Sequence, residues 1–439
     1  MWSSRNNEHS FPTRSTLVRP LLIAVSCAIV PFASAETHRL VLTGAKVLDP
    51  ADGVAREGLQ VVIEGERIVE IAPAPQVSEA IRLDLAGLTL LPGLIDLHSH
   101  LLLHPYNESP WDDQVLRESL ELRTVRAVAA AKATLDAGFT TLRDLGTEGA
   151  GFADVALRDA IAKGIVPGPR IFTTTRAIVA TGCYGPSGFD PRWEVPKGAQ
   201  EATGADGVRR AVREQIAAGA DWIKVYADYR RCDGAPPTPT FSQVELNALV
   251  DESKTAGLPV AAHAFTDEAI RRAVLAGAAS IEHGFHASDE VLGLMRERGV
   301  VLCPTLTAVE SVARYGGWRP GMPDDPRIKE AKEMFARALR SGVTIACGSD
   351  VGVFAHGENA RELELMVEYG MSPLQALRSA TTTAAAVLRQ EKVLGRAAPG
   401  YLADLIAIHG DPLVDLTAVR KPVVVLKAGQ VVLDRRSAP

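Results

Sequence analysis

Four histidines, one aspartate and one lysine lie in or directly after apolar runs along this 439-residue sequence. Two of them, His98 and His100, are separated by one residue, and residues i and i+2 of a β-strand face the same side. Imidazole and carboxylate are ligands of borderline divalent ions such as Zn²⁺. Four histidines and one aspartate exceed the needs of one tetrahedral site, so the set predicts two ions. The six residues are His98, His100, Lys224, His263, His283 and Asp350.

Taken one at a time, these residues are also compatible with ordinary structural roles. A strand-end histidine such as His263 is often a packed core residue, Lys224 can extend its ammonium group to solvent, and Asp350 can cap a helix. Lys224 adds a difficulty, because an ammonium group has no lone pair and repels a cation. The combination of all six over five expected strands nevertheless favours a metal-dependent active site.

The elements that must position these residues alternate through the middle of the chain. Eight short apolar runs suit buried parallel strands, at residues 94–97, 140–142, 170–172, 222–225, 259–262, 280–282, 300–303 and 343–347. Helix-period stretches lie between them, at residues 120–136, 208–218, 242–256, 267–276 and 328–340. This alternation predicts an α/β protein with a (β/α)8 TIM barrel, whose catalytic side chains stand at the carboxyl ends of the strands.

The two ends of the chain have a different pattern, with short β-like runs broken by turns. Strand-rich ends around an alternating middle predict a small β-sandwich domain built from both termini. We therefore expect a signal peptide at residues 1–35, the first part of the β domain at 36–92, the metal-binding barrel at 93–398 and the second part of the β domain at 399–439.

The first 35 residues are typical of a secretory signal peptide. Arg5, Arg14 and Arg19 precede an apolar run at residues 21–30, which is followed by Ala-Ser-Ala at residues 33–35. The run is about half the length that crosses a bilayer. We expect cleavage before Glu36, no membrane attachment afterwards, and a periplasmic or secreted protein. A retained anchor and a lipid attachment at Cys27 stay open.

The composition is that of a globular protein, with 46% hydrophobic and 23% charged residues. The formal net charge is −6, and no block of lysine and arginine could follow a phosphate backbone, which argues against a nucleic-acid partner. The four cysteines beyond the signal have no metal-site spacing. Whether Cys183 and Cys232 form a disulfide stays open.

The segment Pro92-Gly93-Leu94-Ile95-Asp96-Leu97-His98-Ser99-His100 resembles the opening signature of the amidohydrolase superfamily. The resemblance continues in chain order through Lys224, His263, His283 and Asp350 and covers nearly the whole mature chain. It implies that carbon dioxide carboxylates Lys224 and that the resulting carbamate bridges two metal ions. Zinc is the first expectation, and Mn or Co suits the same ligands.

The same resemblance implies a role for each ligand. His98 and His100 hold the more buried ion together with Asp350, whereas His263 and His283 hold the more exposed one. A metal-bridging hydroxide attacks the scissile carbonyl group. Asp350 acts as general base and passes the proton to the leaving nitrogen.

Residues 260–285 and 350–386 are most similar to a prolidase-like, imidazolonepropionase-like branch, which includes Xaa-Pro dipeptidases and ochratoxin-hydrolysing amidohydrolases. Resemblance to this branch implies hydrolysis of dipeptides or N-acyl amino acids, small molecules with an amide bond and a free carboxylate. Members commonly form homo-oligomers, often octamers.

A free carboxylate on the substrate needs a cation or a hydroxyl group to bind it. Tyr226 shares the strand face of Lys224, and Arg230 and Arg231 follow in the next loop, so these three are candidate carboxylate ligands. Both arginines can instead be solvated loop charges. His356, in a glycine-rich loop, is a candidate substrate ligand or a plain loop residue. Tyr184 and Trp193 are candidates for the acyl pocket.

Three other functions remain open at this point. A cyclic-amide hydrolase of the imidazolone type would need no free carboxylate on its substrate. A lactone or phosphotriester hydrolase would use the same metal ligands. A periplasmic metal- or solute-binding scaffold would have no turnover, although the retained Asp350 argues for catalysis.

Overall fold

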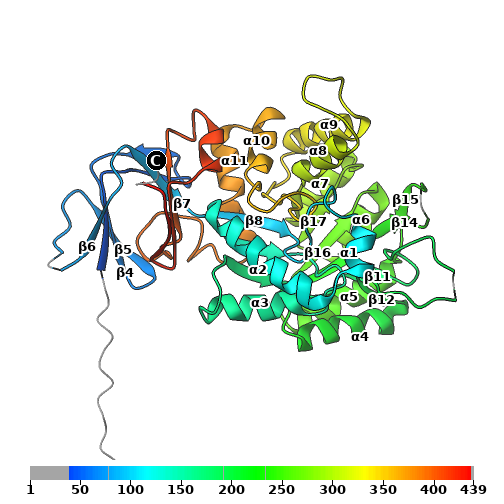
Figure 1. Cartoon of the computed structure of the whole chain (residues 1–439). Coiled ribbons are helices and arrows are strands. Elements are labelled where there is room, and N and C mark those ends of the chain that lie inside the picture. The colour runs from blue at the N-terminus through cyan, green and yellow to red at the C-terminus, as the bar shows by residue number, and fades with distance from the viewer. Residues whose placement is uncertain (1–38, 78, 191, 233, 437–439) are drawn as a thin grey trace, which may run out of the picture. The chain divides into compact units, whose positions relative to one another are not determined.

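The computed structural model describes residues 39–77, 79–190, 192–232 and 234–436 (Figure 1). The expected signal peptide, residues 1–35, lies outside these described residues. Among the helices in the described part of the chain, none is long and apolar enough to cross a membrane.

Parallel strands run through the middle of the chain in two sheets, which have the strand orders β10-β9-β8 and β12-β11-β13-β16-β17-β18. Strands β13, β16 and β17 are buried along their whole length, which explains their continuous apolar character. The bounds are β8 Leu94–Ser99, β9 Phe139–Asp144, β10 Arg170–Thr173, β11 Ile178–Ala180, β12 Gln200–Ala202, β13 Ile223–Tyr226, β16 Val260–Ala264, β17 Ser280–His283 and β18 Val301–Cys303.

Helices follow most of these strands and lie around them in Figure 1. Their ends carry ordinary signals: Ser242 and Glu245 form a capping box at the start of α5, and Gly277 ends α6 with a φ of 98°, which glycine adopts without strain. The bounds are α1 Trp111–Arg117, α2 Leu120–Asp136, α3 Ala153–Ala162, α4 Gly204–Ala217, α5 Gln243–Thr255, α6 Asp267–Ala276, α7 Asp289–Arg298, α8 Leu306–Tyr315, α9 Pro326–Ser341, α10 Arg361–Glu368, α11 Pro373–Ser379 and α12 Thr382–Val387.

The expected eighth strand, residues 343–347, is not a regular strand. Ile345 makes a single parallel bridge to Leu302 of β18, and the main-chain N–H of Leu97 in β8 donates to the carbonyl of Cys347 at 2.9 Å. This segment therefore bonds to an edge strand of each parallel sheet. The described strands form a mixed α/β fold of two parallel sheets and not one continuous closed sheet.

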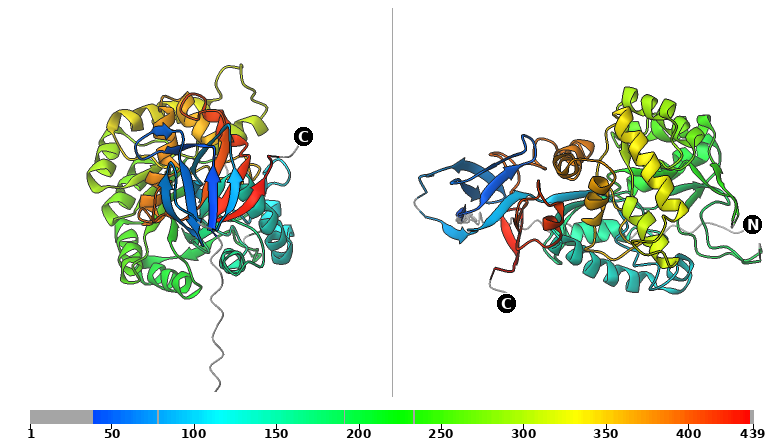
Figure 2. Two further views of the ribbon diagram at one scale, coloured as in Figure 1. Left: turned by 90° about the vertical axis from the view of Figure 1, so that its left-hand side faces the viewer. Right: turned by 90° about the horizontal axis from the view of Figure 1, so that it is seen from above.

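Both ends of the described chain contribute to two further sheets, with the orders β5-β4-β1-β6 and β21-β20-β19-β7-β2-β3. Strand β19 pairs antiparallel with β7, so the two chain ends lie side by side in the colours blue and red of Figure 2. Leu42, Leu90 and Leu426 belong to one buried cluster that both sheets share. The bounds are β1 Arg39–Thr43, β2 Lys46–Asp49, β3 Val54–Arg56, β4 Gln60–Glu64, β5 Arg67–Ala72, β6 Ile81–Asp84, β7 Leu88–Pro92, β19 Leu405–His409, β20 Val424–Lys427 and β21 Gln430–Asp434.

Two small elements complete the fold. A hairpin of β14 (Asp228–Arg230) and β15 (Pro237–Pro239) follows β13, and a short 3₁₀ helix, η1, spans Leu416–Arg420. The hairpin begins two residues after the end of β13, so it lies at the same end of the parallel strands as the candidate ligands.

Candidate active site

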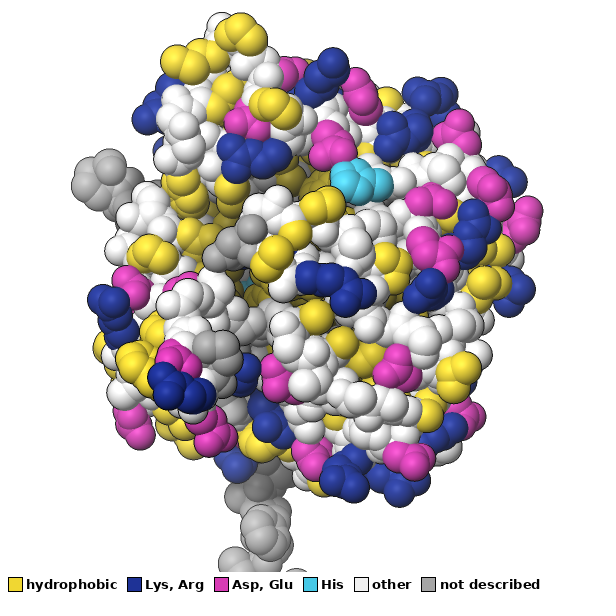
Figure 3. Space-filling model, turned by 90° about the vertical axis from the view of Figure 1, so that its right-hand side faces the viewer, with side chains coloured by type: hydrophobic (Ala, Val, Ile, Leu, Met, Phe, Trp, Pro, Cys, Tyr) yellow, Lys and Arg dark blue, Asp and Glu magenta, His cyan; other side chains and the backbone are white. Residues whose placement is uncertain are grey.

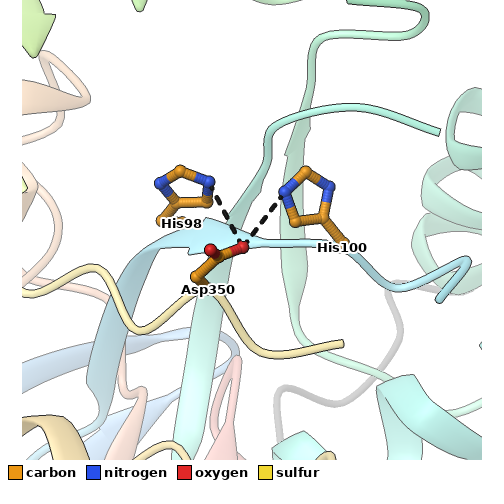
Figure 4. A group of neighbouring side chains, drawn as sticks. All are labelled: His98, His100 and Asp350. Carbon is orange, nitrogen blue, oxygen red and sulfur yellow. Dashed lines mark ion pairs between the residues drawn. The ribbon is translucent and has the colours of Figure 1, made fainter. Parts of the chain in front are cut away.

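The end of β8 holds two histidines against Asp350 (Figure 4). Oδ1 of Asp350 lies 3.6 Å from Nε2 of His98 and 3.3 Å from Nε2 of His100. One potential ligand atom from each of the three residues lies within 4.8 Å of the other two. Two imidazoles and one carboxylate at this spacing suit a divalent metal ion.

The ends of β16 and β17 add two more imidazoles to this group. The ring centroid of His283 lies 5.1 Å from that of His98 and 4.6 Å from that of His263. All four histidines are buried. The four rings therefore form one continuous group, which comes from three strands of two different sheets.

Lys224 lies in β13, beside β16, and its side chain is buried. Its Nζ has no hydrogen-bond partner among the described residues, and burial lowers the pKa of this amine. The lowered pKa favours the neutral amine, which is the form that can react with carbon dioxide. Nε2 of the neighbouring His263 also accepts and donates no hydrogen bond within the described structure. These two unsatisfied nitrogens fit a site completed by metal ions.

Hydrogen bonds on the far side of each ring orient three of the histidines. Nδ1 of His98 lies 2.9 Å from Oε2 of Glu282, and Nδ1 of His100 lies 3.0 Å from the carbonyl oxygen of Gly146. Nδ1 of His283 lies 2.8 Å from the hydroxyl oxygen of Thr305. A ring that donates from Nδ1 keeps the lone pair on Nε2, so these contacts prepare the imidazoles to bind metal.

The loop that carries Asp350 is held against β8 by its backbone. The N–H of Asp350 donates to the carbonyl of His98 at 2.8 Å, and Asp350 has a φ of 63°, in the left-handed region. Gly352, with a φ of 115°, passes so close that a Cβ there would lie 2.6 Å from the main-chain oxygen of His100. This glycine lets the loop approach the histidines closely.

Burial and neighbouring charges set the protonation of the group. Burial lowers the pKa of His98 and His263 well below the usual range and that of His283 to about 4, which leaves these rings neutral and able to bind metal. Burial also acts to lower the pKa of His100, but its hydrogen bond to Asp350 and the charge of Glu148 raise it to about 9.

Burial and neighbouring groups also act in opposite directions on the pKa of Asp350. Burial acts to raise its pKa, but the electrostatic interaction with the His98 ring and the hydrogen bond with His100 outweigh that effect and lower the pKa of the carboxyl group well below its usual range. Asp350 is therefore ionised and able to serve as a metal ligand or a proton acceptor.

The histidines and Asp350 line a cavity of about 510 Å³. It opens on the side of the molecule that carries the β14–β15 hairpin, where Figure 3 shows hydrophobic side chains around a recess. A cavity of this size, with several aromatic side chains in its lining, suits a small organic substrate. The aromatic side chains in the lining are Tyr106, Tyr184, Tyr226, Tyr229, Phe265 and Phe285.

Only some of the candidate substrate ligands line this cavity. Tyr226 and Arg230 line the cavity, and the Tyr226 ring stacks on His263 at 4.3 Å between centroids. Arg231 is outside the lining, and its Nε donates to Thr238 at 3.3 Å. Arg230 is the last residue of β14, whereas Arg231 follows it outside the strand.

His356 is also outside this cavity. Its Nε2 lies 3.1 Å from the carbonyl oxygen of Leu103, and its ring lines a separate hollow of about 660 Å³. Of the two acyl-pocket candidates, Tyr184 lines the cavity with the histidines, whereas Trp193 is 65% exposed and lies outside it.

Sequence reasoning missed three residues that surround the ligands. Glu282 bonds His98, and the buried guanidinium of Arg143 donates to Glu282 at 2.9 Å. Glu148 lines the cavity next to His100, with 3.6 Å between Oε1 and Nδ1. Glu282 is adjacent to His283 in the sequence, which was an available signal. Arg143 and Glu148 belong to no motif that marks them.

Comparisons with known proteins identify the family of this chain. The profile of the Amidohydrolase family matches residues 89–432. Ochratoxinase of Aspergillus niger is 30% identical over 442 residues, which cover 92% of this chain and 89% of the relative.

Two solved structures are similar over almost the same length. A Xaa-Pro dipeptidase with bound methionine in its active site is 33% identical, with a TM-score of 0.80, over 90% of this chain and 100% of that one. A prolidase in complex with N-methylphosphonate-L-proline is 34% identical, also with a TM-score of 0.80 and the same coverage. The family match spans all six candidate ligands, and the protein is a hydrolase that belongs to the amidohydrolase family.

Proposed function

We propose that this protein is a binuclear metal-dependent amide hydrolase that cleaves dipeptides or N-acyl amino acids with a free carboxylate. The observation that carries the proposal is the convergence of four buried histidines, Lys224 and Asp350 beside one aromatic cavity. The relatives that carry the names ochratoxinase, prolidase and Xaa-Pro dipeptidase support amide hydrolysis.

The finer architecture belongs to the same proposal. We propose that the parallel strands belong to a (β/α)8 barrel at residues 93–398, and the bonds of residues 343–347 to both β8 and β18 support this arrangement. The sheets built from residues 36–92 and 399–439 form a β-sandwich, supported by their shared hydrophobic core. The export signal at residues 1–35, a periplasmic or secreted location and a homo-oligomeric state remain proposals from the sequence.

Two metal ions would be held by the group described above. His98, His100 and Asp350 would hold one ion, and His263 and His283 the other. Carboxylated Lys224 would lie between them, because a carbamate is an oxygen-donor anion whereas an ammonium group is not a ligand. The unpartnered Nζ of Lys224 and the orientation of the imidazole rings support this assignment.

When bound, such ions lower the pKa of a water molecule and polarise a carbonyl group. The ionised carboxylate of Asp350 accepts a proton at the reacting centre and passes it to the leaving nitrogen of the amide. The aromatic lining keeps bulk water away from the substrate.

The carboxylate end of the substrate would bind near Tyr226 and Arg230. The guanidinium of Arg230 lies 5.4 Å above the centroid of the Tyr229 ring, at the cavity wall. A guanidinium can bind a carboxylate through two parallel hydrogen bonds, and a phenol hydroxyl can add a third. The proline analogue in the prolidase structure supports a substrate of this class.

Metal content and substrate range test the proposal together. The purified protein should hold two divalent ions per chain and hydrolyse members of a panel of Xaa-Pro, Xaa-Lys and Xaa-Leu dipeptides and N-acyl-phenylalanines, ochratoxin included. Bicarbonate should increase the rate at which the metal-free protein regains activity with Zn²⁺. Turnover of an imidazolone alone would overturn the substrate class, and a protein that binds no metal would overturn the mechanism.

A further inference from the structure

Glu148 is a buried carboxylate in the wall of the candidate active site. It follows β9 with a φ of 49°, and its side chain is 1% exposed. Its Oε2 accepts a hydrogen bond from Nε1 of Trp111 at 2.9 Å and another from the hydroxyl group of Tyr184. Donors from two other segments therefore fix the orientation of the carboxylate.

The second oxygen of Glu148 has no such partner. Oε1 accepts no hydrogen bond from the described residues. It lies 3.6 Å from Nδ1 of His100, but that nitrogen is already 3.0 Å from the carbonyl oxygen of Gly146. A buried carboxylate oxygen without a donor is unfavourable, and a ligand that supplies an N–H group relieves the penalty.

Arg123 bonds the main chain of Glu148 and not its carboxylate. Arg123 donates to the main-chain carbonyls of Leu102, Thr147 and Glu148, at 2.7 to 3.2 Å. Its guanidinium therefore holds the loop that carries Glu148 and donates no hydrogen bond to Oε1. A cationic group on the substrate is the natural partner for such an oxygen.

One aromatic wall connects Glu148 with the proposed carboxylate site. The Tyr184 ring lies 4.4 Å from Tyr226 and 5.0 Å from Tyr229, between centroids, and Arg230 lies over Tyr229. A dipeptide carries an ammonium group at one end and a carboxylate at the other, at most about 7 Å apart in an extended chain. The metal ligands adjoin the same wall, where the amide between these ends would lie.

We propose that Oε1 of Glu148 binds the ammonium group of the substrate's amino-terminal residue, so that free dipeptides are preferred over N-acyl amino acids. This inference rests on the proposed function and narrows its substrate class. Glu148 then acts as a specificity residue, and it takes no part in the bond-breaking step.

Two matched substrate pairs test the inference, alanyl-proline with propionyl-proline and alanyl-phenylalanine with propionyl-phenylalanine. The members of each pair differ by the amino group alone. The wild-type enzyme should have a higher kcat/KM for the alanyl member. Glu148→Gln should lower kcat/KM for the alanyl substrate by about ten- to a hundredfold and change that for the propionyl substrate by less than about threefold.

The glutamine keeps the size of the side chain and an oxygen that can accept from Trp111 and Tyr184. Metal content per chain, measured on the same preparation, should equal that of the wild type. Glu330→Gln is the matched comparison, because Glu330 is the other glutamate in the cavity lining and is bonded to His286 at 2.7 Å. This variant should keep the wild-type ratio of alanyl to propionyl activity.

Three results would overturn the inference while the proposed function stands. One is a wild-type enzyme with equal or greater activity on the propionyl substrates. Another is an equal loss of kcat/KM on both members of a pair in Glu148→Gln. The third is loss of the preference for alanyl over propionyl substrates in Glu330→Gln and not in Glu148→Gln. A metal-loaded wild-type protein that cleaves neither member of either pair nor any amide in the panel would overturn the proposed function itself.

Discussion

Oε2 of Glu282 lies 2.9 Å from Nδ1 of His98, and both side chains are buried. The other oxygen of Glu282 accepts from Nη2 of Arg143 at 2.9 Å and from the hydroxyl of Ser280 at 2.5 Å. The carboxylate is therefore fully bonded. It holds the His98 ring so that Nε2 faces Asp350.

Replacing Glu282 should weaken metal binding more than it alters the fold. Glu282→Gln removes the charge that favours donation from Nδ1 of His98, and loss of such a contact typically lowers metal affinity about ten- to a hundredfold. Competition with a chelator of known affinity measures the effect. Glu252→Gln is the control, because Glu252 of α5 is a buried carboxylate that accepts a hydrogen bond from Arg213 of α4 and lies outside the cavity lining. Equal metal affinities in both variants would contradict this role of Glu282.

Asp350→Asn should separate metal binding from proton transfer. The histidines remain in the variant, so it should retain metal, whereas kcat should fall by about a hundred- to ten-thousandfold because an amide cannot accept the proton. Metal analysis and steady-state rates on one preparation give both quantities. Unchanged kcat would show that Asp350 is not the general base.

Arg230 and Arg231 offer a matched pair of neighbouring substitutions. Arg230→Gln should raise KM for a free-acid substrate by about ten- to a hundredfold and have little effect on the corresponding C-terminal amide, because a charge-assisted hydrogen bond is lost. Arg231→Gln should leave both KM values within about twofold, since Arg231 bonds Thr238 and lies outside the cavity. The ratio of the two KM values is the measurement. The reverse result would assign the carboxylate to Arg231.

His356 should make the folding stability depend on pH. Burial lowers the pKa of His356 to about 4, whereas the unfolded chain binds a proton near the usual value of 6.5. The stability contribution is present above pH 6.5 and is lost as the pH falls from 6.5 towards 4, by up to about 3 kcal/mol.

Urea unfolding at pH 7 and pH 4.5 measures this dependence. The free energy of unfolding should fall less between these pH values in His356→Gln than in the wild type. The groups around the ring are the carbonyl of Leu103, the hydroxyl of Thr134 and the charges of His100 and His104, and the variant leaves all of them in place. The same pH dependence in both proteins would exclude His356 as its source.

Much of the fold could be predicted from local pattern. Seven of the eight expected strands overlap β8, β9, β10, β13, β16, β17 and β18, because buried parallel strands are continuous apolar runs. Helix α2 coincides with the expected range 120–136. The spacing of His98 and His100 identified one strand face as a candidate metal site, since alternation along a strand is a local property.

The prediction of a regular eighth strand was wrong, because the conformation of this segment depends on the strands on both sides of it. Residues 343–347 are apolar enough for a strand, but they bond to β18 at one point and to β8 at the next, and the chain turns at Asp350 into the left-handed region. The separation of Arg230 from Arg231 likewise depends on the path of the chain where β14 ends beside the cavity.

The sequence by itself therefore determined the family, the α/β class and the candidate ligand set, because each depends on residue types, their spacing and the short-range periodicity of apolar residues. Only the tertiary structure decided which carboxylates surround those ligands. Glu282 reaches His98 across 184 positions of sequence and Glu148 reaches His100 across a loop, and such contacts depend on how the strands and loops pack in three dimensions.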